Sequence, residues 1–478
     1  MDTKFENLLM DFYELTMGQS YFDSNTCDTI AYFDLFFRKI PDGGSFVIAN
    51  GIKKCTEYLL QFHFEDSDIE YLKSLNMFSD EYLAKLKSIR FNGDMWAVED
   101  GTIVFPNEPI ITIKSTLLEA QLVETALLLY FNRSSLITTK ASRIVRAARG
   151  RAVMEFGTRR AQGYEAAVDG ALDAYIAGAV GTACTITGKK HGIPVLGTMA
   201  HSFVQSFDSE YEAFCAYAKS FPDNCTLLVD TYNTLRIGIP NAIRVDREIL
   251  KPMGKTLKGI RIDSGDLAYL SKTARIMLDK AGLKDTKIVV SNSLDENIID
   301  SLLSQGAPID SFGVGENMIT AKSCPVFGGV YKLVATERDG KIIPKIKISD
   351  NIEKITNPDF KKIYRIIDNT SGKFVTDIIS IHDEPMPSGK ITLAHPTNVW
   401  TKKSIENYSV KDIRIKMIES GKLIYKIPTI EETRQNVKNN LALLWDEALR
   451  LSYPHTYIIN LSPKLARLKS DLLNKYSN

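Results

Sequence analysis

The sequence has few residues of the kinds that build metal centres or disulfide frameworks. Its 478 residues include six histidines and six cysteines, and no two cysteines form a CxxC pair. This scarcity argues against a structural zinc site and a disulfide framework, and it favours reduced thiols. Lys and Arg total 59 against 58 Asp and Glu, so the net charge of +1 gives no general attraction to nucleic acids or anionic membranes. Any anion site must therefore be local.

Long apolar segments and several common motifs are also missing. No apolar run reaches about 18 residues, the length that spans a membrane, and the N-terminal segment lacks the apolar core of a signal peptide. We therefore expect a cytoplasmic protein without a membrane span. Walker A, GxGxxG, HExxH and GxSxG sequences are absent, which argues against the enzyme classes that carry them.

The chain is long enough for two or three domains, and its pattern of strand-like and helical segments changes twice. We predict an N-terminal α/β domain with a β-hairpin module over residues 1–120. An α/β barrel domain is expected over residues 121–335. A hairpin-rich C-terminal segment, residues 336–478, is expected to pack on the N-terminal domain. The fold class is thus α/β, with an irregular (β/α) barrel and an α/β domain formed from both ends of the chain.

The barrel expectation rests on seven short β-branched runs that alternate with helical segments. The runs are AVMEFG, AGAVGTA, PVLGTMAH, TLLVDTY, GIRIDSG, KIVVSNS and DSFGVGE. The last four are spaced by about one strand–helix–strand unit, and so many units favour a barrel over a doubly wound sheet. We also predict a long helix from Leu117 to Gly150 with one break near Asn132, and a capping box formed by Ser293 and Glu296.

Functional residues of either architecture gather at the carboxyl ends of the strands. Asp230, Asp263 and Asp266 are carboxylates that could hold Mg²⁺ or sugar hydroxyls, and Arg159 and Arg261 suit phosphate or carboxylate groups. The remaining strand-end candidates are Glu155, Phe156, Thr182, His201, Ser202, Ser264, Ser291, Asn292, Gly313 and Gly315.

Each of these features has a simpler interpretation. A strand-end aspartate is often only a helix N-cap, which applies separately to Asp263 and Asp266. His201 on its own is more often a hydrogen-bonded structural histidine than a reactive one. Basic residues recur every three positions along one expected helix, at Lys140, Arg143, Arg146 and Arg149. They could form an RNA-binding stripe, but the neutral net charge favours a phosphate pocket wall or a solvated face.

Eight motifs occur in one fixed order along the chain. They are MDFYELTMG, EDGTIVFPNEP, LLEAQLVET, EFGTRRAQG, GTMAHSFVQSF, LLVDTYNT, RIDSGDL and FGVGE. Together they resemble the nicotinate phosphoribosyltransferases, which are type II phosphoribosyltransferases. The resemblance runs from about residue 8 to 335 and continues more loosely to the C-terminus.

The resemblance implies an enzyme of NAD salvage. Such enzymes join nicotinate to 5-phosphoribosyl 1-diphosphate (PRPP), and they couple the reaction to ATP hydrolysis through a phosphohistidine. It further implies Mg²⁺ carried with PRPP and ATP rather than by the protein alone, and a homodimer with shared active sites. Neither nucleic acid nor membrane is an expected partner.

The resemblance also assigns roles to residues of this chain. His201, in AHS, matches the phosphohistidine, and Arg261 and Asp263 match catalytic positions around ribose and diphosphate. Phe156 would stack on the pyridine ring and Arg159 would pair with its carboxylate. Tyr13, with Asp11 beside it, matches a substrate contact from the neighbouring subunit, and Gly313 and Gly315 match the loop at the 5′-phosphate. Four further substrate contacts are expected from their strand-end positions alone: Thr182, Asp230, Ser291 and Asn292.

Four alternatives remain. Relatives that use nicotinamide carry an aspartate in the turn GTD, where this chain has Ala183; removing that carboxylate favours the acid substrate. Quinolinate phosphoribosyltransferases are much shorter and lack the AHS motif. A non-catalytic PRPP-binding homologue could lose its reactive groups, yet Arg159, His201 and Asp263 are all present. The RNA-binding role is the most distant possibility.

Overall fold

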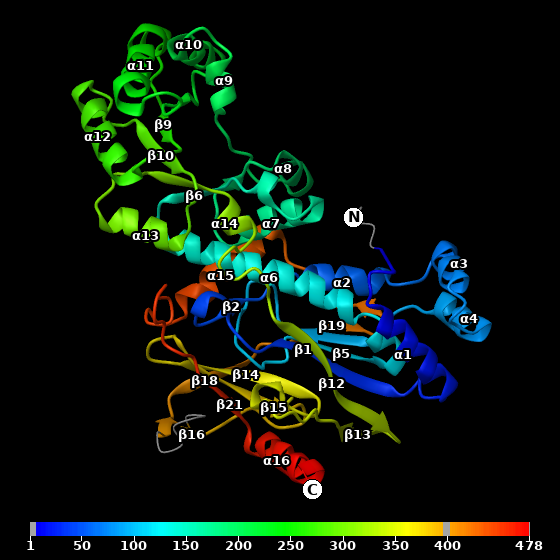
Figure 1. The fold of residues 1–478 in the computed structure, drawn as a ribbon. Coiled ribbons are helices and arrows are strands. Elements are labelled where there is room, and N and C mark those ends of the chain that lie inside the picture. The colour runs from blue at the N-terminus through cyan, green and yellow to red at the C-terminus, as the bar shows by residue number, and fades with distance from the viewer. Residues whose placement is uncertain (1–5, 395–401, 478) are drawn as a thin grey trace. The chain divides into compact units, whose positions relative to one another are not determined.

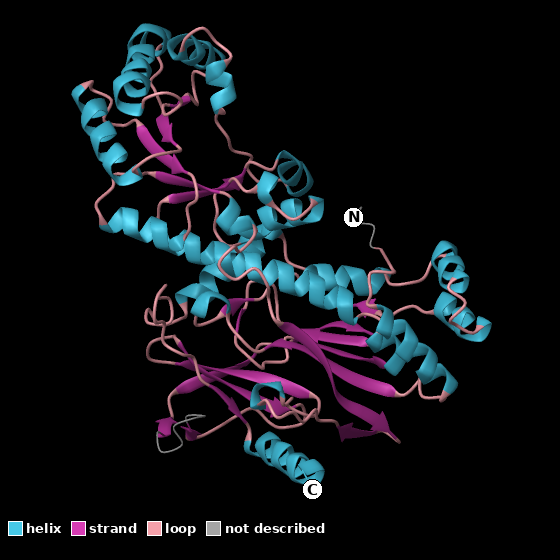
Figure 2. Ribbon diagram, in the orientation of Figure 1, coloured by secondary structure: helices cyan, strands magenta, loops and turns pink. Residues whose placement is uncertain are grey.

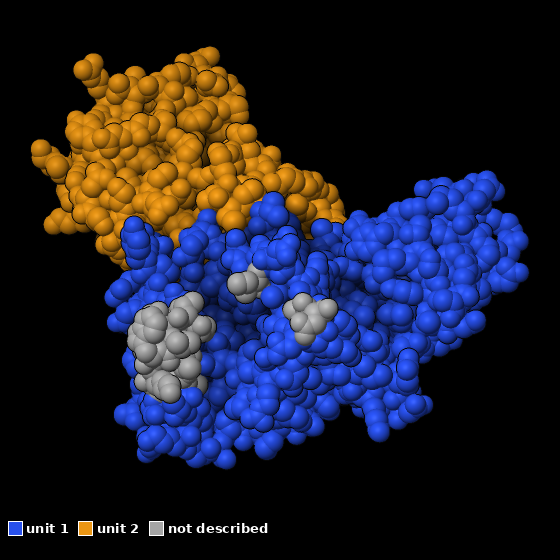
Figure 3. All heavy atoms as spheres, turned by 60° about the horizontal axis from the view of Figure 1, so that its bottom comes forward, with its two compact units in different colours: residues 1–136, 326–478 blue, residues 137–325 orange. Residues whose placement is uncertain are grey.

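The computed structural model describes residues 6–394 and 402–477. The chain divides into two compact units (Figure 3). Unit 1 comprises residues 1–136 and 326–478, and unit 2 comprises residues 137–325. Unit 1 therefore takes its residues from both ends of the chain, and unit 2 is the continuous segment between them.

Unit 2 is built on a parallel sheet. Its strands are β6 (Ala152–Glu155), β7 (Gly181–Thr182), β8 (Thr226–Leu228), β9 (Gly259–Ile262), β10 (Lys287–Ser291) and β11 (Ser311–Val314). They are hydrogen-bonded in the order β7-β6-β11-β10-β9-β8, with every neighbour parallel. Figure 1 labels β6, β9 and β10 of this sheet. The sheet is apolar at its centre, where Ile260, Val290 and Phe312 have no exposed surface. This burial is typical of parallel strands.

Helices connect the strands of unit 2 (Figure 2). The helices and shorter turns are η2 (Thr158–Arg160), α7 (Tyr164–Ile176), α8 (Thr185–His191), α9 (His201–Gln205), α10 (Glu210–Ser220), η3 (Thr234–Gly238), α11 (Ile239–Val245), η4 (Asp246–Leu250), η5 (Lys251–Met253), α12 (Leu267–Lys280), α13 (Glu296–Ser304) and α14 (Glu316–Ile319). Asp266 caps α12, because its side chain accepts hydrogen bonds from the backbone N–H groups of Ala268 and Tyr269.

Six strands form in unit 2, although seven runs predict strands. In the run PVLGTMAH, Val195 makes only an isolated parallel bridge to Thr182, so the run adds no full strand. Among the described strands no pairing joins β7 to β8, so both are edges of the sheet. Closure into a barrel therefore stays a prediction.

Two predicted helix features are wrong in detail. The long helix is interrupted at Leu122 and Val123, between α5 (Leu117–Gln121) and α6 (Glu124–Ala147), and it continues through Asn132. The N-cap of α13 is Asp295, whose side chain accepts the Ile298 N–H at 2.8 Å. Ser293 cannot take that place, because its φ of 50° sets it in a left-handed turn before the helix.

Every antiparallel pairing among the described strands lies in unit 1. Its strands are β1 (Ile30–Phe37), β2 (Val47–Ile48), β3 (Asp94–Ala97), β4 (Ile103–Val104), β5 (Ile111–Thr116), β12 (Gly329–Arg338), β13 (Lys341–Pro344), β14 (Lys361–Asp368), β15 (Phe374–Ile381), β16 (Ile391–Ala394), β17 (Lys402–Ile405), β18 (Tyr408–Asp412), β19 (Ile415–Glu419), β20 (Lys422–Leu423) and β21 (Ile459–Leu461). Its other helices are α1 (Phe12–Asp23), η1 (Pro41–Gly43), α2 (Ile52–Gln61), α3 (Asp66–Ser74), α4 (Asp80–Ser88), η6 (Ile352–Lys354), α15 (Ile430–Ala442) and α16 (Pro463–Ser477).

The two ends of the chain share one sheet in unit 1. Seven strands pair in the order β13-β12-β1-β5-β3-β19-β20, so N-terminal β1 lies directly beside C-terminal β12. A second sheet has the order β18-β14-β15-β21 and contains a buried ion pair, Arg365 with Asp377, at 2.5 Å. The predicted hairpin module is present as the antiparallel pair β3 and β5. The mixed α/β class, with one α/β unit drawn from both chain ends, is thus confirmed.

Candidate functional site

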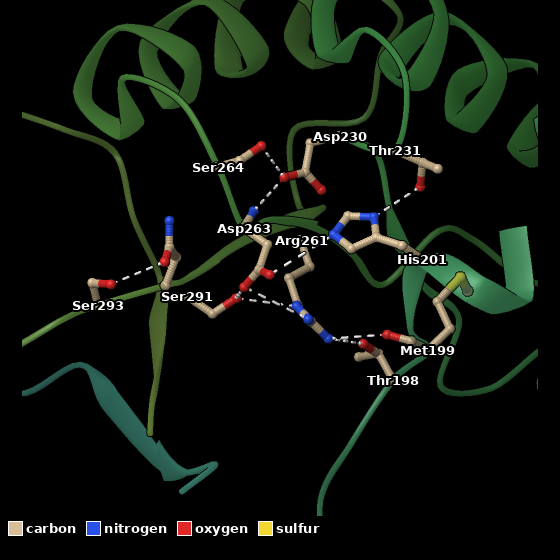
Figure 4. Close-up of polar contacts among 11 residues, drawn as sticks. Thr198, Met199, His201, Asp230, Thr231, Arg261, Asp263, Ser264, Ser291 and Ser293 are labelled. Atoms are coloured by element: carbon tan, nitrogen blue, oxygen red, sulfur yellow. Dashed lines mark hydrogen bonds and ion pairs between the residues drawn. The ribbon is translucent and has the colours of Figure 1, made fainter. Parts of the chain in front are cut away.

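Polar side chains meet at the carboxyl ends of β8, β9 and β10. Asp230 follows β8, Arg261 and Asp263 lie at the end of β9, and Ser291 ends β10. His201, the first residue of α9, points toward the same group of side chains (Figure 4). Five of the residues predicted from strand ends are therefore neighbours in space.

Both ring nitrogens of His201 face polar groups of the site. Its Nδ1 lies 3.1 Å from the hydroxyl oxygen of Thr231, and its Nε2 lies 3.8 Å from Oδ2 of Asp263. The Thr231 contact orients the ring, and because the side chain is 39% exposed, the ring is still open to a ligand. A neutral imidazole with one oriented nitrogen is a competent nucleophile.

The carboxylate of Asp263 links three elements. Its Oδ1 accepts a hydrogen bond from Ser291 and lies 3.7 Å from Nη2 of Arg261. Its backbone N–H donates to Oδ2 of Asp230 at 2.9 Å, and the Ser264 hydroxyl donates to the same oxygen at 2.6 Å. Asp263 is therefore fixed by its main chain and its side chain, with Oδ2 directed at His201.

The two carboxylate oxygens of Asp230 differ in their hydrogen bonding. Its Oδ1 is buried and has no hydrogen-bond partner among the described residues. A buried carboxylate oxygen in that state is costly unless a cation or a donor completes it. Asp230 and Asp263 together offer the hard oxygen ligands that Mg²⁺ prefers, since Mg²⁺ commonly binds through one or two carboxylates plus substrate phosphates. Within the described ranges, no cluster of three or more His, Cys, Asp or Glu residues could hold a metal ion by itself.

Arg261 ties the segment before His201 to the sheet. Its Nη1 donates to the Thr198 hydroxyl at 2.8 Å and to the Met199 carbonyl at 3.2 Å, while its Nε donates to Ser291 at 3.1 Å. The guanidinium is only 15% exposed, so it contributes a fixed positive charge at this end of the sheet.

The end of β6 forms a second part of the site. The Phe156 backbone N–H donates to the Val314 carbonyl at 2.7 Å, and the ring packs on Gly313, where an added Cβ would lie 2.6 Å from ring carbons. Arg159 follows on η2 with an exposed side chain. An aromatic face and an exposed guanidinium on one short loop suit a flat, anionic ring.

Thr182 and Glu155 pair beside this loop. The Thr182 hydroxyl donates to Oε2 of Glu155 at 2.5 Å, and both side chains are buried. Burial raises the pKa of Glu155, although hydrogen bonds from Thr182 and Gly157 lower it in part. Thr182 therefore contacts the protein interior, and Glu155 is an additional buried acid at this edge.

The loops that follow β10 and β11 contact each other. Asn292 has a φ of 88° and accepts a hydrogen bond from Ser293 at 3.1 Å. Gly315 precedes α14, which has only four residues, and an added Cβ there would lie 3.1 Å from the Phe156 carbonyl. Asn317 donates to the Ser293 and Leu294 carbonyls, so the two loops are joined.

Two predicted substrate residues belong to unit 1. Tyr13 lies on α1, is 43% exposed, and has a pKa raised by burial and by Glu124. Asp11 is the N-cap of α1 and donates its backbone N–H to Oε1 of Glu14 at 3.3 Å. All the other predicted site residues belong to unit 2.

Sequence reasoning misses several residues that complete the contacts of His201 and Arg261. The motifs do not single out Thr231 and Thr198, and they indicate Ser264 only as a strand-end residue. Thr231 does follow Asp230 directly at a strand end, and Thr198 stands three residues before His201. Neither position alone shows which partner the hydroxyl takes.

Three residues of the basic stripe form ion pairs within unit 2: Lys140 and Arg143 on α6, and Arg149, two residues beyond its end. Lys140 and Arg143 both bind Glu296 of α13, with 2.9 Å from Lys140 Nζ and 2.9 Å from Arg143 Nε to Oε1. Arg149 pairs with Asp300 at 2.6 Å. Because Lys140 and Arg143 are buried, the stripe is no open surface for RNA. In the described part of the chain, no helix combines the length and the apolar character needed to cross a bilayer.

Three family models match consecutive parts of the chain. Residues 8–132 match the nicotinate phosphoribosyltransferase N-terminal domain, residues 151–366 the nicotinate phosphoribosyltransferase family, and residues 360–469 the nicotinate phosphoribosyltransferase C-terminal domain. Together these matches cover most of the chain, in the order in which the domains are named.

Individual relatives agree with the family models. A nicotinate phosphoribosyltransferase of Bacillus subtilis is 44% identical over 459 residues, covering 95% of this chain and 93% of its own length. One of Mycobacterium tuberculosis is 43% identical over 393 residues, covering 82% of each chain. The crystal structure of human nicotinic acid phosphoribosyltransferase has a TM-score of 0.86 at 28% identity and covers 97% of this chain and 100% of that one. The chain therefore belongs to the nicotinate phosphoribosyltransferase family of enzymes.

Proposed function

We propose that the chain transfers the phosphoribosyl group of PRPP to nicotinate, with ATP hydrolysis coupled through phosphorylation of His201. The products are nicotinate mononucleotide and diphosphate, a step of NAD salvage. The observation that supports the mechanism most is the placement of His201 between Thr231 and Asp263, beside the fixed charge of Arg261.

The contacts of His201 favour one neutral tautomer. With the Nε2–H facing Asp263, Nδ1 carries the lone pair and accepts the hydrogen bond from Thr231. In the proposed step the Thr231 hydroxyl releases this hydrogen bond, and the freed Nδ1 lone pair attacks the γ-phosphorus of ATP while the bond from that phosphorus to the oxygen of ADP breaks. Water later cleaves the phosphorus–nitrogen bond and releases phosphate. Asp263 stabilises the positive charge that develops on the imidazole.

Phosphoribosyl transfer makes a different demand on the same residues. The pyridine nitrogen attacks C1 of the ribose while the C1–oxygen bond to diphosphate breaks, so positive charge builds on the sugar ring. Asp230 and Asp263 would stabilise that charge, and Arg261 would stabilise the departing diphosphate. Asp230 and Asp263 also fit as ligands of Mg²⁺ carried with PRPP or ATP, which would neutralise phosphate charge when bound.

The base would bind at the end of β6. We assign stacking on the pyridine ring to Phe156 and pairing with its carboxylate to Arg159. The turn at Ala183 would border the base, with the buried Thr182 behind it, and without an aspartate that turn does not repel a carboxylate. Ser291, Asn292, Gly313 and Gly315 would border the ribose and its 5′-phosphate. In a homodimer, Tyr13 and Asp11 would complete the site of the second copy.

The expected location is the cytoplasm. No disulfide joins any of the six cysteines, all of which lie in described residues. Thiols in this state suit a reducing compartment.

The function is tested with the full chain, PRPP, Mg²⁺, ATP and either nicotinate or nicotinamide, by following mononucleotide formation. We expect product from nicotinate, with kcat/KM about 100-fold or more above that for nicotinamide. Absence of product from nicotinate would contradict the proposal. A preference for nicotinamide would instead support the alternative enzyme, and PRPP binding without turnover would support a non-catalytic homologue.

A further inference from the structure

Glu155 is a fully buried acid with partners on two different segments. Its Oε1 accepts the backbone N–H of Gly157, and its Oε2 accepts the hydroxyl of Thr182 at 2.5 Å. Glu155 and Thr182 are cross-strand partners at the ends of β6 and β7. One carboxyl group therefore joins the loop after β6 to the turn after β7.

The turn after β7 depends on Glu155 through main chain as well as side chain. The Ala183 backbone N–H donates to the Glu155 carbonyl at 2.8 Å. The hydroxyl of Thr182 in turn accepts the backbone N–H of Cys184, also at 2.8 Å. Three consecutive residues of the turn, Thr182 to Cys184, are thus connected to Glu155 directly or through one hydroxyl.

The loop after β6 is attached just as tightly. A Cβ added to Gly157 would lie 2.6 Å from Cβ of Ile319 and 2.8 Å from Oε1 of Glu155, so no larger residue fits beside the carboxyl group. The preceding residue, Phe156, is bound to the Val314 carbonyl. The start of the Phe156–Arg159 loop is therefore fixed from both sides.

Glu155 has no charge partner that would explain its burial. Among the described residues no lysine or arginine forms an ion pair with it, and its side chain has no exposed surface. Burying an acid without a cation lowers stability, so a group of this kind is expected to have another role. Its two hydrogen bonds connect the Phe156–Arg159 loop to the turn at Ala183, the two segments that would contact the base.

We propose that Glu155 is a positioning residue that sets the distance between the Phe156–Arg159 loop and the turn at Ala183, and through that distance the preference for a pyridine carboxylate over its amide. The inference rests on the proposed function. Phe156 and Arg159 follow Glu155 on one segment, and Ala183 lies on the other. A change in their separation alters the fit of the carboxylate without touching His201 or the residues around it.

The test compares three variants of the full chain with a matched control. Glu155→Ala removes both side-chain hydrogen bonds of Glu155. Thr182→Val removes the one from Thr182, together with the hydrogen bond from the Cys184 N–H, at nearly the same side-chain volume. Glu155→Gln can keep both, since its amide oxygen can accept from Gly157 and its amide N–H can donate to Thr182. The control is Thr286→Val, which removes another buried hydroxyl of unit 2, bound to the Leu257 carbonyl at 2.9 Å.

The measured quantities are KM for nicotinate, KM for PRPP, the nicotinate to nicotinamide ratio of kcat/KM, and the rate of labelling by γ-labelled ATP. We expect Glu155→Ala and Thr182→Val each to raise KM for nicotinate at least about tenfold and to lower the ratio at least about tenfold, the effect of losing at least one hydrogen bond. KM for PRPP and the labelling rate should change less than about threefold. Glu155→Gln and Thr286→Val should leave the ratio within about threefold of the parent enzyme.

The possible failures can be told apart. An unchanged nicotinate KM and ratio in Thr182→Val would overturn the inference, even if Glu155→Ala does not fold. A Glu155→Gln enzyme as impaired as Glu155→Ala would also overturn it, because charge rather than position would then be required. Lack of product from nicotinate in the parent enzyme would overturn the proposed function itself.

Discussion

The Nδ1 atom of His201 lies 3.1 Å from the Thr231 hydroxyl, while Nε2 of the same ring faces Asp263 at 3.8 Å. The two contacts act on different nitrogens and so orient the ring from both sides. Because Thr231 and Asp263 lie at the ends of adjacent strands, β8 and β9, the sheet itself sets the orientation of the imidazole.

Thr231→Val should slow phosphorylation of His201 by ATP about tenfold, because the ring loses the hydrogen bond that orients Nδ1. Thr231→Ser keeps the hydroxyl and should recover most of that rate. The measurement is the initial rate of acid-labile labelling from γ-labelled ATP, with thermal unfolding as a check on the fold. Equal labelling rates in the valine and serine variants would contradict the proposed orientation.

Gly313→Ala separates two roles of the loop after β11. The added Cβ would meet the Phe156 ring at 2.6 Å and displace it. If that ring stacks on the pyridine, KM for nicotinate should rise about tenfold, whereas KM for PRPP should rise less. A variant in which only KM for PRPP rises would show that Gly313 acts at the phosphate and that Phe156 does not stack on the pyridine ring.

Glu14 should make the stability of the chain depend on pH. Burial raises its pKa from 4.5 to about 7, against hydrogen bonds from Thr125 and Asp11, and its Oε2 has no hydrogen-bond partner among the described residues. Between these two values the folded chain binds more protons than the unfolded chain. The contribution of Glu14 therefore becomes less favourable as pH rises from 4.5 to 7, by about 3 kcal/mol in total.

The check on Glu14 is urea unfolding at pH 5 and pH 8 for the parent chain and Glu14→Gln. The amide introduced by this substitution does not titrate, so the variant should lose less stability than the parent between these pH values. The comparison of the two differences removes the contribution of every other titrating group. Equal losses in both proteins would show that Glu14 is already ionised at pH 5.

Glu296 should contribute more to the free energy of unfolding than Asp300, a half-exposed residue on the same helix. Burial alone would raise its pKa, but the charges of Lys140 and Arg143 hold that pKa below its usual value. Glu296→Gln removes the charge that faces two buried cations and should cost about 3 to 5 kcal/mol. The control, Asp300→Asn, breaks the half-exposed pair with Arg149 and should cost at most about 1 kcal/mol. Equal shifts of the urea midpoint would contradict the buried arrangement.

Much of this site follows from one rule applied to the sequence. Parallel strands share an edge, so residues at the carboxyl ends of several runs are expected to meet, and His201, Asp230, Arg261, Asp263 and Ser291 do. The same rule cannot separate Asp263 from Asp266, three positions apart. Only the start of α12 shows that Asp266 is an N-cap.

Other features depend on contacts that no local pattern encodes. Thr231, Thr198 and Glu155 take their partners across strands, so their positions give no signal of their roles. The predicted cap of α13 is wrong because Ser293 satisfies the capping pattern, while its left-handed backbone excludes it. The third of the seven expected strands does not form. PVLGTMAH has the composition of a strand, yet only Val195 finds a bridge partner.

The most direct test of the mechanism is acid-labile labelling of the protein by γ-labelled ATP, measured for the parent chain and for His201→Asn in the same assay as nicotinate mononucleotide formation. We expect labelling of the parent chain, no labelling of the variant, and residual transfer in the variant that no longer responds to ATP. Acid-labile labelling that survives in His201→Asn, or transfer by that variant that ATP still stimulates, would contradict phosphorylation of His201.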